Sequence, residues 1–193
     1  MNEKLRTVCA RLGALTGLEP ATLRHCQRVR TLSLVIGENL GLSSSELTTL
    51  SLGSLLHDIG KKQIPRDILL KSTPLTEEEW KTIQQHPVDG YEYARRHTLP
   101  HSVQEIILHH HLWYDGSGGY PEHDDDARPS CLTQIASVAD VVDAMTQDRP
   151  YRRALGLDSS LDFLAEQSGT QFSPVVVESV ERNLNQIKKL VGA

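Results

Sequence analysis

The stretch LLHDIGKKQIP, residues 55–65, ends an apolar segment with a histidine, an aspartate and a lysine. The residues LTTLSLGSLL, 47–56, have the spacing of a helix that buries its leucines. Asp58 lies two residues after this segment, and Lys61 comes one turn later. An ionised carboxylate in an apolar setting costs free energy unless it is paired with a cation or binds a metal. The sequence therefore predicts that Asp58 has a cationic partner.

Length and composition indicate one globular domain. The 193 residues suffice for a full-sized core, and the net charge of -5 does not suggest a general nucleic-acid binder. No apolar run reaches the roughly 18 residues that a transmembrane helix needs, and the N-terminus lacks the apolar core of a signal peptide. Cys9, Cys26 and Cys131 lie far apart without a CxxC pair, which suggests reduced thiols. We expect a cytoplasmic protein that binds neither a nucleic-acid polymer nor a membrane.

Helical periodicity runs through the chain, and no alternating strand pattern of useful length occurs. Apolar residues recur at spacings of three and four at Leu23, Val29, Leu32, Ile36, Leu40, Leu47, Leu50, Leu55, Ile59, Val103, Ile106, Ile107, Ile135, Val138, Val142, Met145, Val176, Val180, Leu184 and Ile187. We predict an all-α fold, with a helical bundle over residues 22–193 after an N-terminal helical extension over residues 1–21. The long irregular stretch, residues 114–130, is rich in Gly, Pro and Asp, and such loops are often functional.

Capping signals predict where two helices begin. In LGLSSSELTTL, residues 40–50, Gly41 ends one helix and a serine-rich segment caps the next. In STPLTEEEW, residues 72–80, Thr76 is the expected N-cap and Glu79 completes a capping box.

The nine histidines are unusually numerous, and three of them are consecutive at 109–111. Helical spacing from Ile106 and Ile107 places His110 and His111 at the border of a buried stripe, whereas His109 is expected to be more exposed. His25 precedes Val29, Leu32 and Ile36 at helical spacing, so it faces inward. Asp140 lies among apolar and small residues. His86 precedes Pro87, so we expect it at a helix break with its side chain aimed inward.

Each of these residues has a simple structural explanation when it is taken singly. A lone histidine on an apolar face is usually a hydrogen-bonded core residue, and a lone aspartate caps a helix or pairs with an arginine. Together, five histidines and two aspartates point inward from about five helices. Imidazole and carboxylate suit iron, manganese, zinc or nickel, and seven such groups exceed the needs of one ion. An aspartate that bridges two ions would explain Asp58, and paired metals recur in phosphate-ester hydrolysis.

Six segments, in this order and spacing, resemble the HD-GYP family, a branch of the HD-domain metal-dependent phosphohydrolases. They are HDIGK at 57–61, ILLKSTPLTEEE at 68–79, HPVDG at 86–90, HHLWYDGSGGYP at 110–121, VADVVDAMTQDRPYRRA at 138–154 and GTQFSP at 169–174. The resemblance covers residues 22–181. It implies an all-helical fold and hydrolysis of cyclic di-GMP to linear pGpG, with GMP as a minor product.

The resemblance also implies roles for individual residues. The metal ligands would be His25, His57, Asp58, His86, His110, His111 and Asp140. Asp58 would bridge the metals and Lys61 would face the scissile phosphate, so that both serve catalysis. Lys61, Arg149, Arg152 and Tyr120 would contact the substrate.

The resemblance further implies the number of metals and the mechanism. Family members with a third metal have a glutamate where this chain has Ala21, so we expect two divalent ions. Iron or manganese is favoured, with zinc or nickel as alternatives. The two ions would lower the pKa of a bridging water, so that hydroxide attacks phosphorus.

Three departures from the family pattern keep a second hypothesis open. Leu112 replaces the usual glutamate after the paired histidines, the loop DGSGGYP has one extra glycine, and Ser173 replaces the usual aspartate. None removes an expected ligand. A catalytically weak domain that binds cyclic di-GMP and a signalling partner through the GYP loop is therefore the alternative to an active phosphodiesterase. A nucleotidase acting on another nucleotide is a third, weaker hypothesis.

Overall fold

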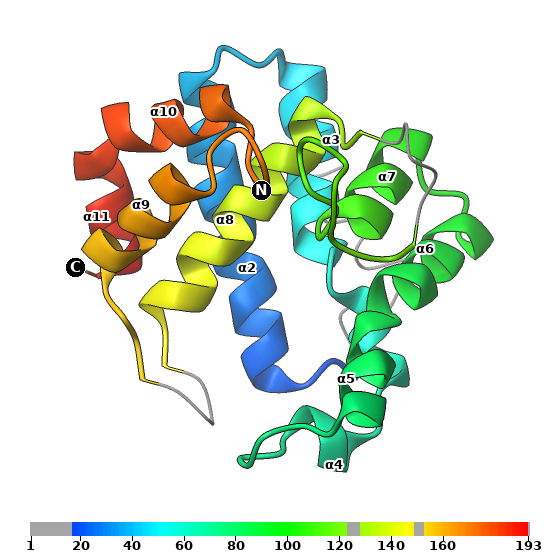
Figure 1. Ribbon diagram of the computed structural model, residues 1–193. Coiled ribbons are helices and arrows are strands. Elements are labelled where there is room, and N and C mark those ends of the chain that lie inside the picture. Colours follow the sequence, from blue (N-terminus) through cyan, green and yellow to red (C-terminus); the bar gives the residue numbers. More distant parts are fainter. Residues whose placement is uncertain (1–16, 123–127, 149–152, 193) are drawn as a thin grey trace.

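The computed structural model describes residues 17–122, 128–148 and 153–192. As the periodicity predicts, the described residues form helices joined by loops (Figure 1). They contain no named strand, only isolated bridges between Leu112 and Gly119 and between Ser168 and Phe172. Residues 1–16 lie outside the described ranges, so the helical extension expected there stays a prediction.

The helices follow one another along the chain in the order given by their bounds. They are α2 (Pro20–Asn39), α3 (Ser44–Leu56), the 3-10 helix η1 (Ile59–Gln63), α4 (Arg66–Leu69), α5 (Glu77–Gln84), α6 (His86–Arg96), α7 (His101–His109), α8 (Cys131–Thr146), α9 (Leu157–Glu166), α10 (Pro174–Arg182) and α11 (Leu184–Val191). No helix among these is long and apolar enough to cross a membrane.

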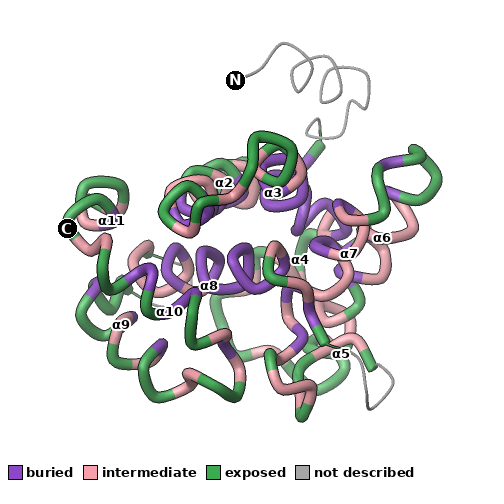
Figure 2. Tube along the Cα trace, turned by 90° about the horizontal axis from the view of Figure 1, so that it is seen from above, coloured by how far each residue is buried: buried purple, intermediate pink, exposed green. Residues whose placement is uncertain are grey.

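Helix α8 is the central element. It packs against α2, α3 and α7 and also against α9 and α10, and Figure 2 shows it buried along most of its length. The helix begins after Ser130, whose side chain accepts a hydrogen bond from the Thr133 amide. Its middle carries small and apolar residues, as a helix enclosed on all sides requires. Two aspartates, Asp140 and Asp143, are buried in this same helix.

The apolar core consists of two clusters. One surrounds α8 with residues that include Val29, Leu32, Ile36, Ile135, Val138, Val142, Phe172, Val176, Val180 and Ile187. The other joins α3, η1, α6 and α7 through Leu52, Leu56, Ile59, Ala94, Val103 and Ile107. The predicted apolar stripes of 29–36, 135–142 and 176–187 therefore face the first cluster. Elements of both clusters contribute to the site described below.

The predicted helix boundaries are confirmed. Helix α2 ends before Gly41, which has a φ of 76°, and Ser43 caps α3 in a capping box with Glu46. Thr76 caps α5 in the same manner with Glu79. Helix α5 ends at Gln84 and α6 begins at His86, so the break expected at His86 is present.

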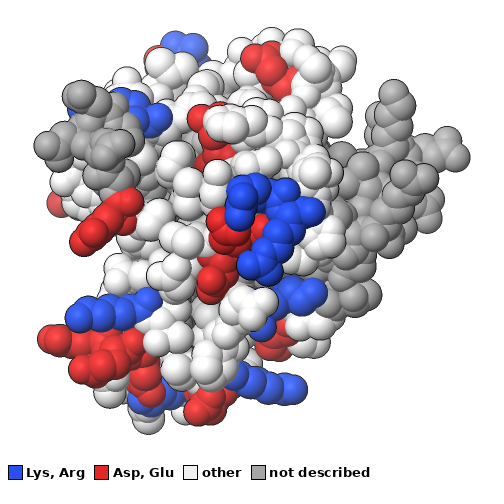
Figure 3. Space-filling view, turned by 90° about the vertical axis from the view of Figure 1, so that its right-hand side faces the viewer, with Lys and Arg blue, Asp and Glu red and all other residues white. Residues whose placement is uncertain are grey.

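Charged side chains of both signs are intermixed on the surface. Figure 3 shows basic and acidic residues next to one another on one face of the molecule, with no broad basic patch. Surface ion pairs of this kind include Arg95 with Glu92 at 2.9 Å and Arg182 with Glu178 at 2.5 Å. Such exposed pairs contribute little to stability. This face offers no extended basic track for a nucleic-acid backbone.

A backbone contact at Gly60 fixes how η1 lies on α6. A Cβ atom at Gly60 would lie 1.9 Å from the carbonyl oxygen of His86, and Gly90 lies on the same contact. The absence of a side chain at Gly60 therefore allows the turn that follows Asp58 to rest directly on the first turn of α6. This contact brings Asp58 and His86 side by side.

We predict that Gly60→Ala loses about 3 kcal/mol of unfolding free energy, because the new methyl group meets backbone atoms that cannot rotate away. Gly41→Ala is the matched control: nothing lies within 4 Å of its Cβ, so the positive φ alone costs about 1 kcal/mol. Urea unfolding followed by circular dichroism measures both values. Equal losses in the two variants would contradict the close contact.

Candidate metal centre

The structure brings all seven predicted ligand side chains together. They come from α2 (His25), the end of α3 (His57 and Asp58), the start of α6 (His86), the end of α7 (His110 and His111) and α8 (Asp140). His111 is half-buried and the other six are buried. The expected inward face of His25 and inward aim of His86 are both observed. His109 is half-buried, so the expectation that it is exposed was too strong.

The ligand atoms form two groups with Asp58 between them. His25, His57 and Asp58 form one group and His86, His110 and His111 form the other, with the ligand atoms in each group within 4.8 Å of one another. Asp58 Oδ2 lies 3.6 Å from His25 Nε2 and 3.5 Å from His57 Nε2. Asp58 Oδ1 lies 3.2 Å from His86 Nε2. The two oxygens of one carboxylate thus face different groups.

Asp140 joins the first group from the opposite side. Its Oδ1 atom lies 3.0 Å from His25 Nε2 and 3.9 Å from His57 Nε2. The group therefore contains two imidazoles and two carboxylates, which is a suitable donor set for a divalent transition metal.

Three histidines are held in the same tautomer by the ends of their helices. The Nδ1 atoms of His57, His86 and His110 each donate to the carbonyl oxygen three residues earlier, at 2.8, 2.8 and 2.9 Å. Those carbonyls lie in the last turns of α3, α5 and α7, where helical carbonyls lack amide partners. With the proton on Nδ1, each Nε2 presents a lone pair to the centre.

Atoms without partners show that this centre fits cations. His57 Nε2 and Asp58 Oδ1 are buried and make no hydrogen bond. The contact between His86 Nε2 and Asp58 Oδ1 is no hydrogen bond because the His86 proton resides on Nδ1. His86 Nε2 also lies 3.1 Å from His110 Nε2, so two lone pairs face each other. A cation in each group would satisfy these atoms, whose lack of partners otherwise costs about 1–3 kcal/mol each.

Burial and charge set the protonation states that metal binding needs. Burial lowers the pKa of His57 and of His110, and it lowers the pKa of His111 to about 3. These imidazoles are therefore neutral at pH 7. Burial opposes ionisation of Asp58, but the positive charge of Lys61 prevails and holds the pKa of Asp58 well below its usual range.

His25 differs from the other histidines in its protonation. Burial works against its charged form, but hydrogen bonds with Asp140 and Asp143 prevail and raise the pKa of His25 to about 9. Burial likewise opposes ionisation of Asp140, and its pairing with His25 keeps its pKa well below normal. A metal ion binding at His25 Nε2 near pH 7 would therefore displace a proton.

Lys61 is the cationic partner that the sequence predicts for Asp58. Its Nζ atom lies 2.6 Å from Asp58 Oδ2, and the side chain is mostly buried. Lys61 belongs to η1, so the Gly60 contact that fixes this turn also fixes the ammonium group.

Of the other residues predicted to bind the substrate, the structure describes Tyr120. The Tyr120 ring stacks on the His111 ring, with centroids 4.4 Å apart and an angle of 30° between the planes. Tyr120 therefore lies beside the second ligand group, and burial raises its pKa, so it carries a neutral phenol. Arg149 and Arg152 lie outside the described residues, and their substrate contacts stay predictions.

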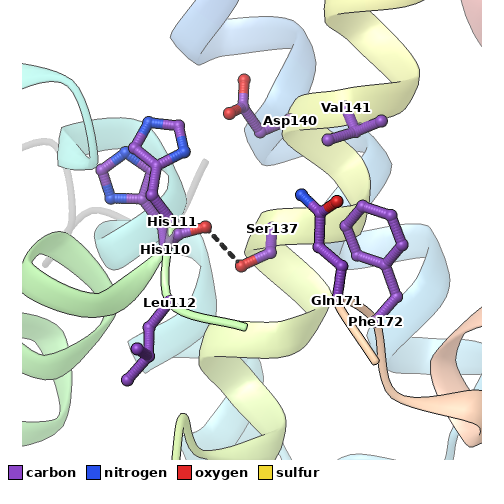
Figure 4. A pocket seen from close by; sticks show the side chains of 8 residues that line it. All are labelled: His110, His111, Leu112, Ser137, Asp140, Val141, Gln171 and Phe172. Carbon is purple, nitrogen blue, oxygen red and sulfur yellow. Dashed lines mark hydrogen bonds between the residues drawn. The ribbon is translucent and has the colours of Figure 1, made fainter. Parts of the chain in front are cut away.

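The segment after α7 is held against α8 and the loop before α10. Figure 4 shows His110 and His111 across a small pocket from Gln171 and Phe172, with Asp140 and Ser137 of α8 between them. Ser137 Oγ donates to the His110 carbonyl at 2.6 Å. These contacts position both histidines relative to Asp140.

The altered GYP loop is closely packed. Leu112 is buried, and Gln134 links its carbonyl to the amide of Ser173. A Cβ at Gly118 would lie 2.9 Å from the Trp113 ring, and a Cβ at Gly119 would lie 2.1 Å from the His111 carbonyl. The two consecutive glycines thus let the loop fold back onto the residues that follow His111, and the departures at Leu112, at Ser173 and in the glycines leave the ligand set intact.

Sequence reasoning missed three polar residues of α8 near the site. Asp143 contacts His25, Ser137 contacts the His110 backbone, and Gln134 spans two loops. Asp143 could have been identified from the sequence, because it lies one turn after Asp140 in a buried helix. Ser137 and Gln134 act through backbone atoms of distant segments, which a periodicity argument cannot identify.

Comparisons with known proteins agree with this geometry. Residues 13–176 match the family described as "HD domain". The chain is 33% identical to the cyclic di-GMP phosphodiesterase response regulator RpfG of Xanthomonas campestris. The alignment covers all of this chain and 51% of the relative. It is 39% identical, over 82% of its length and 43% of the relative, to a cyclic di-GMP phosphodiesterase of Thermotoga maritima. Among solved structures, a cyclic GMP-AMP specific phosphodiesterase of Vibrio cholerae aligns with a TM-score of 0.68 and 21% identity, over 98% of this chain and 51% of that one.

The chain belongs to the HD-domain family of proteins, and its resemblance to the HD-GYP branch is confirmed. The solved structure shares the fold. The chain spans about half the length of the curated relatives it matches.

We predict that Asp58→Ala removes most of the bound metal and leaves a helical protein, because both ligand groups lose their shared oxygen donor. Asp58→Asn separates charge from shape. It keeps the side-chain volume and loses the charge, so it should also retain less metal than the wild type. Elemental analysis gives the metal content, and circular dichroism gives the fold. Metal content equal to that of the wild type in Asp58→Ala would contradict the bridging role.

Proposed function

We propose that this domain is a metal-dependent phosphodiesterase that hydrolyses cyclic di-GMP to linear pGpG, with GMP as a minor product. The observation that carries the proposal is the single carboxylate of Asp58 between two ligand groups. The names of two relatives, both cyclic di-GMP phosphodiesterases, support the choice of substrate. The expected compartment remains the cytoplasm.

In this proposal His25, His57, Asp58 and Asp140 hold one divalent ion, and Asp58, His86, His110 and His111 hold the other. When bound, the ions would activate water and stabilise charge on the phosphoryl oxygens. Iron or manganese is favoured by the mixture of imidazole and carboxylate, with zinc or nickel as alternatives.

Lys61 and Tyr120 have separate roles in this proposal. Lys61 donates to the oxygens of the scissile phosphate, where negative charge develops in the transition state. Tyr120, stacked on His111, forms a wall of the substrate site at the GYP loop. Arg149 and Arg152 bind a more distant phosphate.

We propose two metals and not three because the position that carries a glutamate in three-metal members has no carboxylate in this chain. Ala21 stands at the position of the glutamate in three-metal members. The nearby Glu19 carboxylate accepts hydrogen bonds from the amides of Ala21 and Thr22 at 2.7 and 3.1 Å and so caps α2. A two-metal site should open the ring readily and process the more flexible pGpG slowly.

The alternative function is a weakly active domain that binds cyclic di-GMP and signals through a protein partner at the GYP loop. The buried Leu112 and the exposed Tyr114 in this segment favour it, since Tyr114 offers an aromatic contact surface.

A cyclic GMP-AMP phosphodiesterase among the structural neighbours makes the hybrid dinucleotide a second substrate to test.

We predict that the protein purified with manganese or iron converts cyclic di-GMP to pGpG, with GMP late and minor. Chromatography of timed samples separates the products, and elemental analysis counts the metals. Cyclic GMP-AMP in a parallel assay reports selectivity. GMP as the dominant early product, or three metals per chain, would contradict the two-metal proposal, and absence of turnover with retained ligand binding would favour the alternative.

We predict that Lys61→Ala lowers kcat by about 100-fold or more, because its donor acts on developing charge. Arg149→Ala should mainly raise KM, since a distant phosphate contact is equally present in the ground and transition states. Steady-state kinetics on both variants separates the two constants. If Lys61→Ala changed KM alone, its assignment to the transition state would be wrong.

A further inference from the structure

His25 lacks the hydrogen bond to a nearby backbone carbonyl that fixes the rings of His57, His86 and His110. His57, His86 and His110 donate Nδ1–H to carbonyls in the last turns of helices. His25 lies inside α2, where the surrounding carbonyls are engaged in the helical hydrogen-bond ladder. Its ring orientation must therefore be set by a residue from another element.

That residue is Asp143 on α8. His25 Nδ1 lies 2.7 Å from Asp143 Oδ2, and Asp143 is buried at 1% exposure. Asp143 follows Asp140 by one turn, so the same helix meets both nitrogens of His25: Asp143 at Nδ1 and Asp140 Oδ1 at 3.0 Å from Nε2.

Arg28 completes the arrangement from α2. Its Nε atom donates to Asp143 Oδ1 at 2.6 Å and its Nη2 atom donates to Oδ2 at 3.0 Å. A forked pair of this kind fixes the plane of the carboxylate as well as its position. Arg28 lies one turn after His25, so both side chains contact the same carboxylate, that of Asp143.

We propose that Asp143, held by Arg28, is the positioning residue that makes His25 a metal ligand. A neutral imidazole carries one proton, and carboxylates lie at both of its nitrogens. Asp143 accepts the proton on Nδ1 and so leaves the Nε2 lone pair toward Asp58 and Asp140. Without Asp143, the neutral ring could carry its proton on Nε2, bonded to Asp140, so His25 would be a weaker metal ligand. The inference rests on the metal site proposed above, though not on hydrolysis of any substrate.

A merely structural role makes a different prediction. If the Asp143–Arg28 pair only ties α2 to α8, its loss lowers stability and leaves metal affinity unchanged. If it positions His25, its loss weakens metal binding at the group that contains His25 while the group of His86, His110 and His111 keeps its donors. Metal affinity in the folded protein therefore separates the two roles.

The test is calorimetric titration of Mn²⁺ into metal-free protein, with circular dichroism and thermal unfolding in parallel. We expect two ions in the wild type and, in Asp143→Ala, one of them about 10–100-fold weaker. Asp143→Asn keeps an acceptor oxygen near Nδ1, so its affinity should lie between the two. Arg28→Ala should weaken the same ion by less and should add nothing in the Asp143→Ala background, because it acts through Asp143.

Ser33→Ala is the matched control. Ser33 is buried on the same helix and accepts a hydrogen bond from Ser54 at 3.0 Å. Its loss should lower the thermal midpoint and leave both Mn²⁺ affinities unchanged.

Wild-type affinity for both ions in folded Asp143→Ala would overturn the proposal. If that variant does not fold, wild-type affinities in both Arg28→Ala and Asp143→Asn would overturn it equally. A wild-type protein that binds no Mn²⁺, Fe²⁺ or Zn²⁺ would overturn the metal site itself, which is a distinct result from failure of Asp143 alone.

Discussion

The buried carboxylate of Asp58 is the constraint on which the site depends. It lies in the interior, with Lys61 at 2.6 Å on one oxygen and His86 at 3.2 Å from the other. A buried anion needs compensating charge from every side that water cannot reach. Histidines, a lysine and the proposed metals therefore gather around one residue, and α3, α6 and α7 each end or begin at this point. The sharp change from α3 to η1, and the glycine contact of η1 with α6, follow from this requirement.

Much of the fold and the ligand set can be predicted from the sequence because both depend on local patterns. The stripe from Val29 to Ile36 identifies the buried face of α2, and His25 shares that face. Gly41 and Thr76 mark helix boundaries through backbone conformation and capping, which are properties of a few neighbouring residues. His86 next to Pro87 identifies a break because proline restricts the residue before it.

The remaining features depend on contacts between distant segments. Asp143 and Arg28 are separated by most of the chain, and only the packing of α2 on α8 brings them together. Gln134 shows the same limit, since it connects Leu112 with Ser173 through backbone atoms. A pattern of side chains carries no information about which carbonyl a distant amide will meet.

The distribution of the ligands along the chain has a consequence for the cell. His25 and Asp140 meet only in the folded protein, so a metal that binds this set binds the native state and not the unfolded chain. A ligand with this preference adds about 2.7 kcal/mol to folding when it is present at 100 times its dissociation constant. Native stability then varies with the supply of the metal. Scarcity of metal would lower the amount of folded protein that survives proteolysis as well as the fraction that is active, so that one nutrient would set both the abundance and the activity of the protein.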